Sequence, residues 1–225
     1  METKNQMVFD RQYQIFDPKE QKTNIIVVGC GSIGSFVTLT LAKLGFDKIT
    51  ALDFDKVEKE NIPNQFYRFC DIGKYKVDAI KEITKDFSGL DITTINTKID
   101  ENNKFLDKVV IDLNTLVILA LDNIEARKLI YNELKELPIK ILDVRVGGEA
   151  SNIYLLDLEN EKDKSDYEAL LEKPASEDEC GNKFVIYNIL NVASETCNIV
   201  KRLDKGEPTT KVFMRTMANY RIISS

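Results

Sequence analysis

The sequence predicts an α/β fold, a Rossmann-like and mostly parallel sheet with helices on both faces, extended by antiparallel strands near the C-terminus. Strand-like and helix-like segments alternate over the first 145 residues. A glycine-rich turn at residues 29–34 joins the first predicted strand to the first predicted helix. After Gly147 and Gly148 the pattern changes to short strands and one long helix. These three observations predict a parallel sheet with an antiparallel extension.

The predicted elements of the parallel part follow in order. Residues 24–28 form an apolar run typical of a buried strand, and residues 32–44 carry a helical apolar stripe that ends at Gly45. The remaining elements are predicted as strands at 48–52, 91–96, 116–121 and 139–142 and as helices at 74–87 and 124–137.

The C-terminal part is predicted as a strand at 152–156, a long helix at 184–203 and short strands at 212–214 and 221–223. Residues 158–180 hold nine acids and three lysines, and we expect a mobile acidic loop there. The whole chain, residues 1–225, is interpreted as one domain. Its nucleotide-binding part spans about residues 8–150, and its C-terminal part, with the acidic crossover loop, about 151–225.

Composition excludes several classes of function. The 225 residues include no histidine, so catalytic triads that use imidazole are excluded. The four cysteines form no C-x-x-C pair, and we expect no zinc. With 31 basic against 37 acidic residues, no nucleic-acid partner is expected. The longest apolar run, residues 115–121, is too short to span a membrane, so we expect a cytoplasmic protein without a membrane partner.

The sharpest local signal is the glycine-rich turn Gly29-Cys30-Gly31-Ser32-Ile33-Gly34. Glycines in such a turn let backbone amides approach phosphates at a helix N-terminus. Asp53 follows 19 residues after Gly34, at the end of the second predicted strand, where a carboxylate can accept from ribose hydroxyls. The alternative is a glycine turn that serves packing alone.

The residues after Asp53 add a second set of motifs. They run through Asp55, then Asn61, Gln65 and Arg68, and then Asp71-Ile-Gly-Lys-Tyr-Lys76. In this order they resemble the ubiquitin-activating-enzyme-like family of ThiF, MoeB and HesA, whose pattern is a glycine loop, D-x-D, N-x-x-R-Q and D-x-G-x-x-K. Further matches are Asp10-Arg11-Gln12, and Asp122-Asn123 with Arg127. The resemblance covers about residues 8–150.

The resemblance implies an ATP- and magnesium-dependent adenylyltransferase. Its implied substrate is the C-terminal carboxylate of a ubiquitin-like or sulfur-carrier protein with a C-terminal glycine tail. A carboxylate is already a nucleophile at neutral pH, so a chain without histidine lacks nothing for this reaction. The reaction instead needs in-line positioning and compensation of phosphate charge.

The resemblance also implies roles for individual residues. Asp53 would hold the ribose, Lys76 would neutralise phosphate charge and Asp122 would hold magnesium. Arg11 would reach across a homodimer interface to the ATP of the neighbour. The implied catalytic residues are Arg11, Asn61, Lys76 and Asp122, and the implied nucleotide-binding residues are Gly29, Gly31, Ser32, Gly34, Asp53, Asp55, Asn61, Gln65, Lys76, Asp122 and Asn123.

Most of these residues have a structural alternative. Lys76 and Arg11 are also compatible with solvated surface charges, and Asp122 with a cap on the helix that starts near Asn123. Asn61 and Asp55 fall in a predicted loop, where Asn and Asp often stabilise turns. The joint spacing favours the functional interpretation.

The sequence departs from the family pattern at position 64. Asn64 stands where the family has arginine, and we expect Arg68, four residues on, to reach the same site from the same helical face as a substitute catalytic residue. The paired cysteines that bind zinc in many members are also missing.

Two further features keep two interpretations each. Arg145, before Gly147-Gly148, is either a contact for a substrate tail or part of a turn between sheet segments. Cys180 is either a thiol for thioester or sulfur transfer or a packing thiol, and no basic neighbour in the sequence activates it. For the whole chain, the alternatives are an NAD-dependent oxidoreductase and a noncatalytic nucleotide-binding scaffold partner of the same fold.

Overall fold

The computed structural model describes residues 9–172, 185–217 and 221–225. These residues form an eight-stranded sheet in the order β3-β2-β1-β4-β5-β6-β7-β8. Neighbours from β3 to β5 pair in parallel, and those from β5 to β8 pair antiparallel. The predicted fold class is confirmed. The strands are β1 (Asn24–Val28), β2 (Ile49–Asp53), β3 (Thr93–Asn96), β4 (Thr115–Leu119), β5 (Lys140–Gly147), β6 (Ala150–Asp157), β7 (Val212–Thr216) and β8 (Arg221–Ser224).

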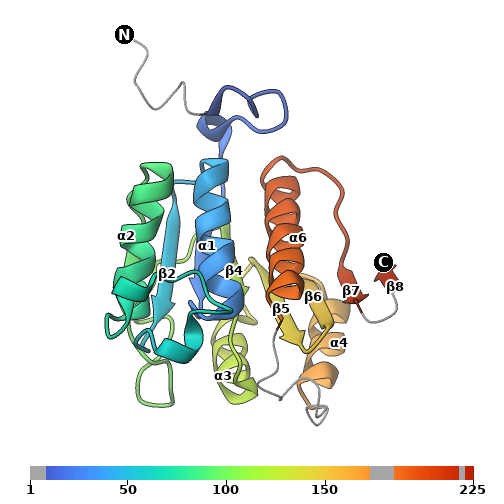
Figure 1. Ribbon diagram of the computed structural model, residues 1–225. Coiled ribbons are helices and arrows are strands. Elements are labelled where there is room, and N and C mark those ends of the chain that lie inside the picture. The colour runs from blue at the N-terminus through green and yellow to red at the C-terminus, as the bar shows by residue number, and fades with distance from the viewer. Residues whose placement is uncertain (1–8, 173–184, 218–220) are drawn as a thin grey trace.

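Helices cover both faces of this sheet (Figure 1). In the described residues the α-helices are α1 (Ser32–Leu44), α2 (Lys76–Ser88), α3 (Ile124–Leu134), α4 (Glu161–Leu171) and α6 (Ile186–Asp204). Short 3-10 helices are η2 (Pro18–Glu20), η3 (Lys59–Asn61) and η4 (Phe69–Asp71). One core cluster joins α1, α2 and α6 to the sheet, through side chains such as Val37, Ile80 and Val192. The other joins α3 and α4 to the opposite face, through side chains such as Tyr131 and Leu171.

The expectation of a mobile loop over the acidic stretch is wrong for residues 161–171, which form α4. The side chain of Asn160 caps this helix by accepting from the backbone N–H groups of Lys162 and Asp163. Tyr167 and Leu171, four residues apart, are buried on one side of α4, and their spacing is that of a helical stripe. The acids lie mostly on the exposed side. The rest of the stretch, including Cys180, lies outside the described residues.

The Gly147-Gly148 segment closes a hairpin between β5 and β6. Gly147 is the partner of Ala150 in the register, and Gly148 has φ +54°, a conformation that favours glycine. Both strands extend beyond the predicted bounds. Because β5 pairs in parallel with β4 and antiparallel with β6, the sheet changes from parallel to antiparallel at this hairpin. Among the described helices, none is both long enough and apolar enough for a membrane span.

Candidate active site

The glycine loop connects β1 to α1, and two of its glycines are required by close packing. Gly29 has φ +93°, and a Cβ there would lie 2.5 Å from the carbonyl oxygen of Ala120. A Cβ on Gly34 would lie 1.7 Å from the carbonyl oxygen of Gly29. Gly31 differs, because nothing lies within 4 Å of a Cβ built on it. Packing therefore explains Gly29 and Gly34, while the open space at Gly31 fits the approach of a ligand to the helix N-terminus that starts at Ser32.

The loop lies where the strand order reverses. From β1 the chain proceeds to β2 on one side of the sheet, whereas β4 lies on the other side of β1. The N–H of Gly29 donates to Leu52 O (2.8 Å), and the N–H of Ala120 donates to Val28 O (2.8 Å). The segments that follow β1, β2 and β4 therefore meet at one edge of the sheet. Open α/β sheets bind ligands in this crevice, at the carboxyl ends of the strands.

Asp53 ends β2 and lies beside the glycine loop. Its Oδ2 accepts from the N–H of Cys30 (2.6 Å), and its Oδ1 accepts from the N–H of Asp55 (2.8 Å). The side chain is buried. Burial raises the pKa of Asp53, and the nearby Lys76 only partly opposes this shift. Each carboxylate oxygen has two acceptor sites, so Asp53 can fix the glycine loop and still accept from a ribose hydroxyl.

Lys76 is the first residue of α2, and its side chain is 8% exposed. Its Nζ lies 2.9 Å from Oδ2 of Asp55, whose side chain is 48% exposed. Lys76 is therefore a buried cation rather than a solvated surface charge. Asp55, in contrast, remains accessible to water, so an anionic ligand can replace it at Lys76 with little rearrangement.

Asn61 and Gln65 lie in the loop between β2 and α2. Oδ1 of Asn61 accepts from the N–H of Glu58 (2.9 Å), which is the turn-stabilising role that the sequence left open. Within the described residues, Oε1 of Gln65 and Oδ1 of Asn64 are buried without a hydrogen-bond partner. Buried polar atoms usually have partners, so these two fit a loop that is completed by a ligand or by water.

Asp122 and Asn123 follow β4, and Asn123 rather than Asp122 is the cap of the next helix, α3. Asn123 caps α3 by accepting from the N–H groups of Glu125 (2.8 Å) and Ala126 (3.3 Å). The exposed carboxylate of Asp122 makes no hydrogen bond or ion pair within the part of the chain that the structure describes. The described residues contain no cluster of three or more candidate metal ligands. Among the described residues, Asp122 is therefore a single carboxylate that could hold magnesium only together with ligands from outside the protein.

Arg11 lies at the other end of the molecule. The Nε2 of its neighbour Gln12 donates to Leu44 O at the end of α1, and Arg11 lines a hollow of about 170 Å³ with Lys43 and Phe87. Figure 1 shows this N-terminal segment at the edge opposite the carboxyl ends of the parallel strands. Arg11 is therefore not part of the group that Asp53, Lys76 and Asp122 form in the same chain.

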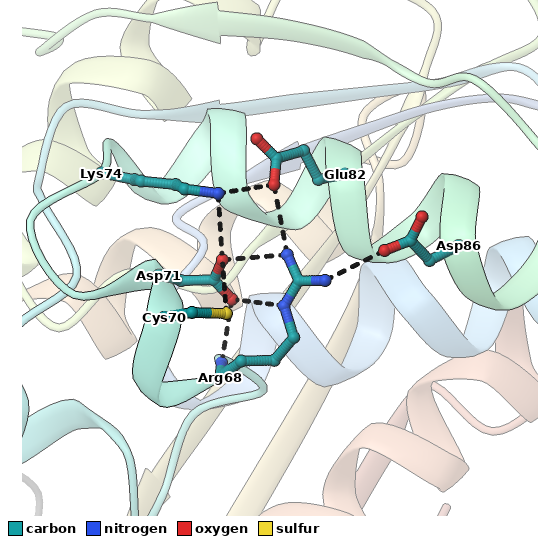
Figure 2. Close-up of polar contacts among 6 residues, drawn as sticks. All are labelled: Arg68, Cys70, Asp71, Lys74, Glu82 and Asp86. Carbon is teal, nitrogen blue, oxygen red and sulfur yellow. Dashed lines mark hydrogen bonds and ion pairs between the residues drawn. The ribbon is translucent and has the colours of Figure 1, made fainter.

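Arg68 does not share a helical face with Asn64, because residues 62–66 form turns and bends. Arg68 is the N-cap of η4, and its guanidinium donates to Asp71, Glu82 and Asp86 (Figure 2). The prediction that Arg68 reaches the site of Asn64 from a shared helical face is therefore wrong. A catalytic role for Arg68 stays a prediction.

Arg145 forms part of a buried network. Its Nη2 lies 2.7 Å from Oδ2 of Asp143, which is 0% exposed, and its guanidinium lies 5.6 Å from the ring centroid of Tyr154. The hydroxyl of Tyr167 donates to the same Asp143 oxygen (2.8 Å), and Arg127 forms an ion pair with Oδ1. These contacts favour a structural role for Arg145 at the start of the antiparallel extension.

Tyr67 is a residue of the site that no motif in the sequence predicts. Its buried hydroxyl donates to Cys30 O in the glycine loop (2.6 Å). A second contact also joins the loop between β2 and α2 to the segment after β1: the N–H of Phe66 donates to Oγ of Ser35 in α1 (3.0 Å). Both contacts join residues more than 30 positions apart, and no local spacing in the sequence indicates them.

A glycine loop at the reversal point of a mostly parallel sheet, with a buried acid after the second strand, defines a nucleotide-binding protein of the Rossmann-like class. The ThiF family profile matches residues 9–221, and the chain belongs to that family.

Curated relatives match mainly the nucleotide-binding part. The NEDD8-activating enzyme E1 catalytic subunit of Caenorhabditis elegans is 32% identical over 126 residues, which is 55% of this chain and 28% of that protein. The adenylyltransferase and sulfurtransferase MOCS3 of Culex quinquefasciatus is 26% identical over 193 residues, covering 81% of this chain and 42% of that protein. The chain thus spans less than half the length of these relatives.

Solved structures show the same fold at low identity. PaaA has a TM-score of 0.77 at 17% identity, with 100% of this chain and 84% of that chain covered. MccB of E. coli, with AMPCPP and MccA, has a TM-score of 0.71 at 19% identity, covering 92% of this chain and 65% of that chain.

Proposed function

We propose that this protein is an ATP- and magnesium-dependent adenylyltransferase that activates the C-terminal carboxylate of a ubiquitin-like or sulfur-carrier protein. One observation carries the proposal. A buried cation, Lys76, and a carboxylate without a partner among the described residues, Asp122, lie at the same edge of the sheet as the glycine loop. The names of the relatives, an activating enzyme and an adenylyltransferase, support this reaction class.

In the proposed reaction, a carboxylate oxygen of the substrate attacks the α-phosphorus of ATP. A new O–P bond forms, the bond to the pyrophosphate oxygen breaks, and pyrophosphate carries away the electron pair. The glycine-loop amides and Lys76 orient the phosphates and compensate their charge. Asp53 fixes the ribose, and Gln65 lines the phosphate site with Asn61. Asp122 would hold magnesium, which would supply further compensation of the phosphate charge.

We also propose a homodimer in which Arg11 acts in trans. Arg11 is exposed and lies near the end of α1, at the edge opposite the glycine loop of its own chain. A second copy is therefore the simplest source of an Arg11 guanidinium at the phosphates. Loss of activity in Arg11→Ala, restored by mixing with a Lys76→Ala protein, would support this arrangement. Failure of the mixture to regain activity would oppose it.

Thermal unfolding with ATP and magnesium, with NAD, and with neither tests the nucleotide. A ligand at about 100 times its dissociation constant adds about 2.7 kcal/mol to the free energy of unfolding, or on the order of 5–10 °C for a chain of this length. A shift with ATP alone supports the proposal. A shift with NAD alone would oppose the proposal and favour an NAD-dependent oxidoreductase.

Pyrophosphate exchange separates an enzyme from a noncatalytic partner. With a carrier protein that ends in Gly-Gly, the proposal predicts exchange of labelled pyrophosphate into ATP. Asp122→Ala should abolish this exchange and leave the unfolding temperature unchanged, because its carboxylate has no partner among the described residues. Glu125→Ala, an exposed acid in the first turn of α3, is the matched control and should keep full activity. Activity in Asp122→Ala equal to that of the control would reject the assignment.

A further inference from the structure

Residues 54–75 form one loop that connects the end of β2 to the start of α2. The base of this loop is fixed by the N–H of Val57, which donates to Lys74 O (2.9 Å), and by the N–H of Gly73, which donates to Val57 O (2.8 Å). The loop contains the proposed ligand contacts Asn61 and Gln65, and it ends at Lys76. Its position relative to the glycine loop therefore determines whether these residues meet the same nucleotide.

Inside this loop, Arg68 and Asp71 form a bidentate ion pair (Figure 2). Arg68 Nε lies 2.8 Å from Oδ2 of Asp71, and Nη2 lies 2.9 Å from Oδ1. The backbone N–H of Arg68 also donates to Oδ2 (2.9 Å), and Lys74 Nζ lies 3.3 Å from Oδ1. Asp71 is 0% exposed. Planar two-point contacts of this kind fix geometry more strongly than single ion pairs do.

The same arginine extends to α2. Its Nη2 donates to Glu82 (3.2 Å) and its Nη1 donates to Asp86 (2.9 Å). Its chain neighbour Tyr67 reaches the opposite way, to the carbonyl oxygen of Cys30 in the glycine loop. Residues 67 and 68 thus connect the glycine loop to α2, the helix that carries Lys76 at its first position.

We infer that Arg68 is a positioning residue, which acts through Asp71 to hold the loop of residues 54–75, and with it Asn61, Gln65 and Lys76, against the glycine loop. This inference rests on the proposed function for its effect on nucleotide binding. It assigns to Arg68 a role different from that of the substitute catalytic residue that its spacing from Asn64 predicted.

A direct phosphate contact fits the geometry less well. Four of the five guanidinium N–H donors of Arg68 are engaged by Asp71, Glu82 and Asp86. Rotation of the Arg68 side chain toward a phosphate would remove both guanidinium contacts of buried Asp71, which would keep the backbone N–H of Arg68, Lys74 and the weak donor Cys70. Burial opposes ionisation of Asp71, but the hydrogen bonds and charge of Arg68, together with the hydrogen bond from Lys74, outweigh it, and the pKa of Asp71 lies below its usual value. The carboxylate is therefore charged at neutral pH and needs this partner.

A double-mutant cycle with Arg68→Ala and Asp71→Asn tests the inference, measured by the KM for ATP and by amide hydrogen exchange of residues 54–75. Each single variant should raise the KM for ATP by about 10- to 100-fold, because misplacement by about 1 Å costs up to that much. The double variant should be no worse than the worse single variant. Arg68→Lys, which keeps the charge but not the planar fork, should recover part of the loss and guards against failure of the alanine variant to fold.

The matched control is Asp91→Asn, which removes the exposed pair that Asp91 forms with Lys81 of α2 (3.2 Å). It should change neither the KM nor the exchange of the loop. Independent, multiplying losses in the cycle would overturn the inference, because Arg68 would then act without Asp71. A normal KM in Arg68→Ala would overturn it as well. If the wild type binds no ATP but Arg68→Ala still loses protection of residues 54–75, the loop contact stands and the proposed function fails.

Discussion

Two pairs of oppositely charged side chains lie at the carboxyl-end edge of the parallel strands, one beside β2 and one beside β5, and they differ in exposure. Lys76 and Asp55 bridge α2 to the segment after β2, with side-chain exposures of 8% and 48%. Arg127 and Asp143 bridge α3 to β5, with exposures of 5% and 0%. In the first pair only the cation is buried, whereas in the second both partners are.

The difference indicates different uses of the same chemistry. Arg127 also donates to Leu119 O (3.3 Å) and Val144 O (3.1 Å), so it holds two strands as well as Asp143. A buried pair cannot exchange partners without a large free-energy cost. In the proposed function, Lys76 exchanges half-exposed Asp55 for a phosphate, and the exposure of Asp55 keeps the cost of that exchange small. The sheet therefore has a fixed support on the β5 side and an exchangeable cation on the β2 side.

The largest effect should follow removal of the fixed cation. Arg127→Met keeps much of the side-chain volume but leaves a buried carboxylate with fewer partners. The free energy of unfolding should fall by about 3–5 kcal/mol, or on the order of 6–20 °C in unfolding temperature for this chain length. Urea denaturation of the variant and the wild type measures the difference in the free energy of unfolding. A loss below about 1 kcal/mol would place this pair in the same class as exposed pairs.

The exchangeable cation should affect activity rather than stability. Lys76→Met should lower adenylation by about 100- to 1000-fold, as loss of one preorganised charge contact typically does. Its unfolding temperature should stay close to that of the wild type, because Asp55 remains accessible to water. Pyrophosphate exchange measures the loss. Lys81→Met, a half-exposed lysine of the same helix, should behave as wild type. Equal activity in both variants would remove Lys76 from the site.

A smaller effect is expected at Asp55. If Asp55 only occupies Lys76 until a phosphate arrives, Asp55→Asn should tighten ATP binding by up to about fivefold. Calorimetric titration with ATP and magnesium measures this change. Weaker binding would instead favour the direct nucleotide contact that the family resemblance implies for Asp55.

The smallest effect is a pH dependence at Asp53. Burial raises the pKa of Asp53 above the ordinary value of 3.8. The folded protein therefore takes up a proton at Asp53 at a higher pH than the unfolded chain does, so this carboxyl lowers stability once the pH rises through its folded pKa. Its ionised form is the one that accepts from ribose hydroxyls and backbone amides. ATP affinity should thus fall as the pH drops through a pKa that lies above 3.8. Affinity that stays constant down to pH 3.8 in a folded protein would contradict this.

The sequence was sufficient for elements whose signals are local. The bounds of β1 and α1 agree with the prediction, because a buried apolar run, a glycine turn, a helical stripe and Gly45 mark them. The acidic composition of residues 158–180 predicts a loop, whereas the cap at Asn160 and the spacing of Tyr167 and Leu171 predict the helix α4 that the structure shows. Those two signals were present in the sequence.

The candidate site divides in the same way. Asp53, Lys76 and Asp122 could be placed at one edge because each follows from a motif and from the end of a strand or the start of a helix. The contact of Tyr67 with Cys30 and the contacts of Arg68 with α2 depend on tertiary packing between distant segments. Periodicity and motif spacing carry no information on such contacts. The contacts of Tyr67 and Arg68 can be identified only from the three-dimensional arrangement of residues 54–75.

The contact between Tyr67 and Cys30 holds the glycine loop closed, and the buried thiol of Cys30 can report when that loop opens. The Cys30 thiol is 0% exposed, and burial raises its pKa well above the usual value, so it is inert toward alkylating reagents while the loop is closed. Cys70 is the exposed thiol among the described cysteines. In a Cys70→Ser, Cys180→Ser background, with the modified residue identified by peptide mapping, the rate at which Cys30 is alkylated would report how often the nucleotide loop opens. Slower alkylation in the presence of ATP would show how long a bound nucleotide keeps that loop closed.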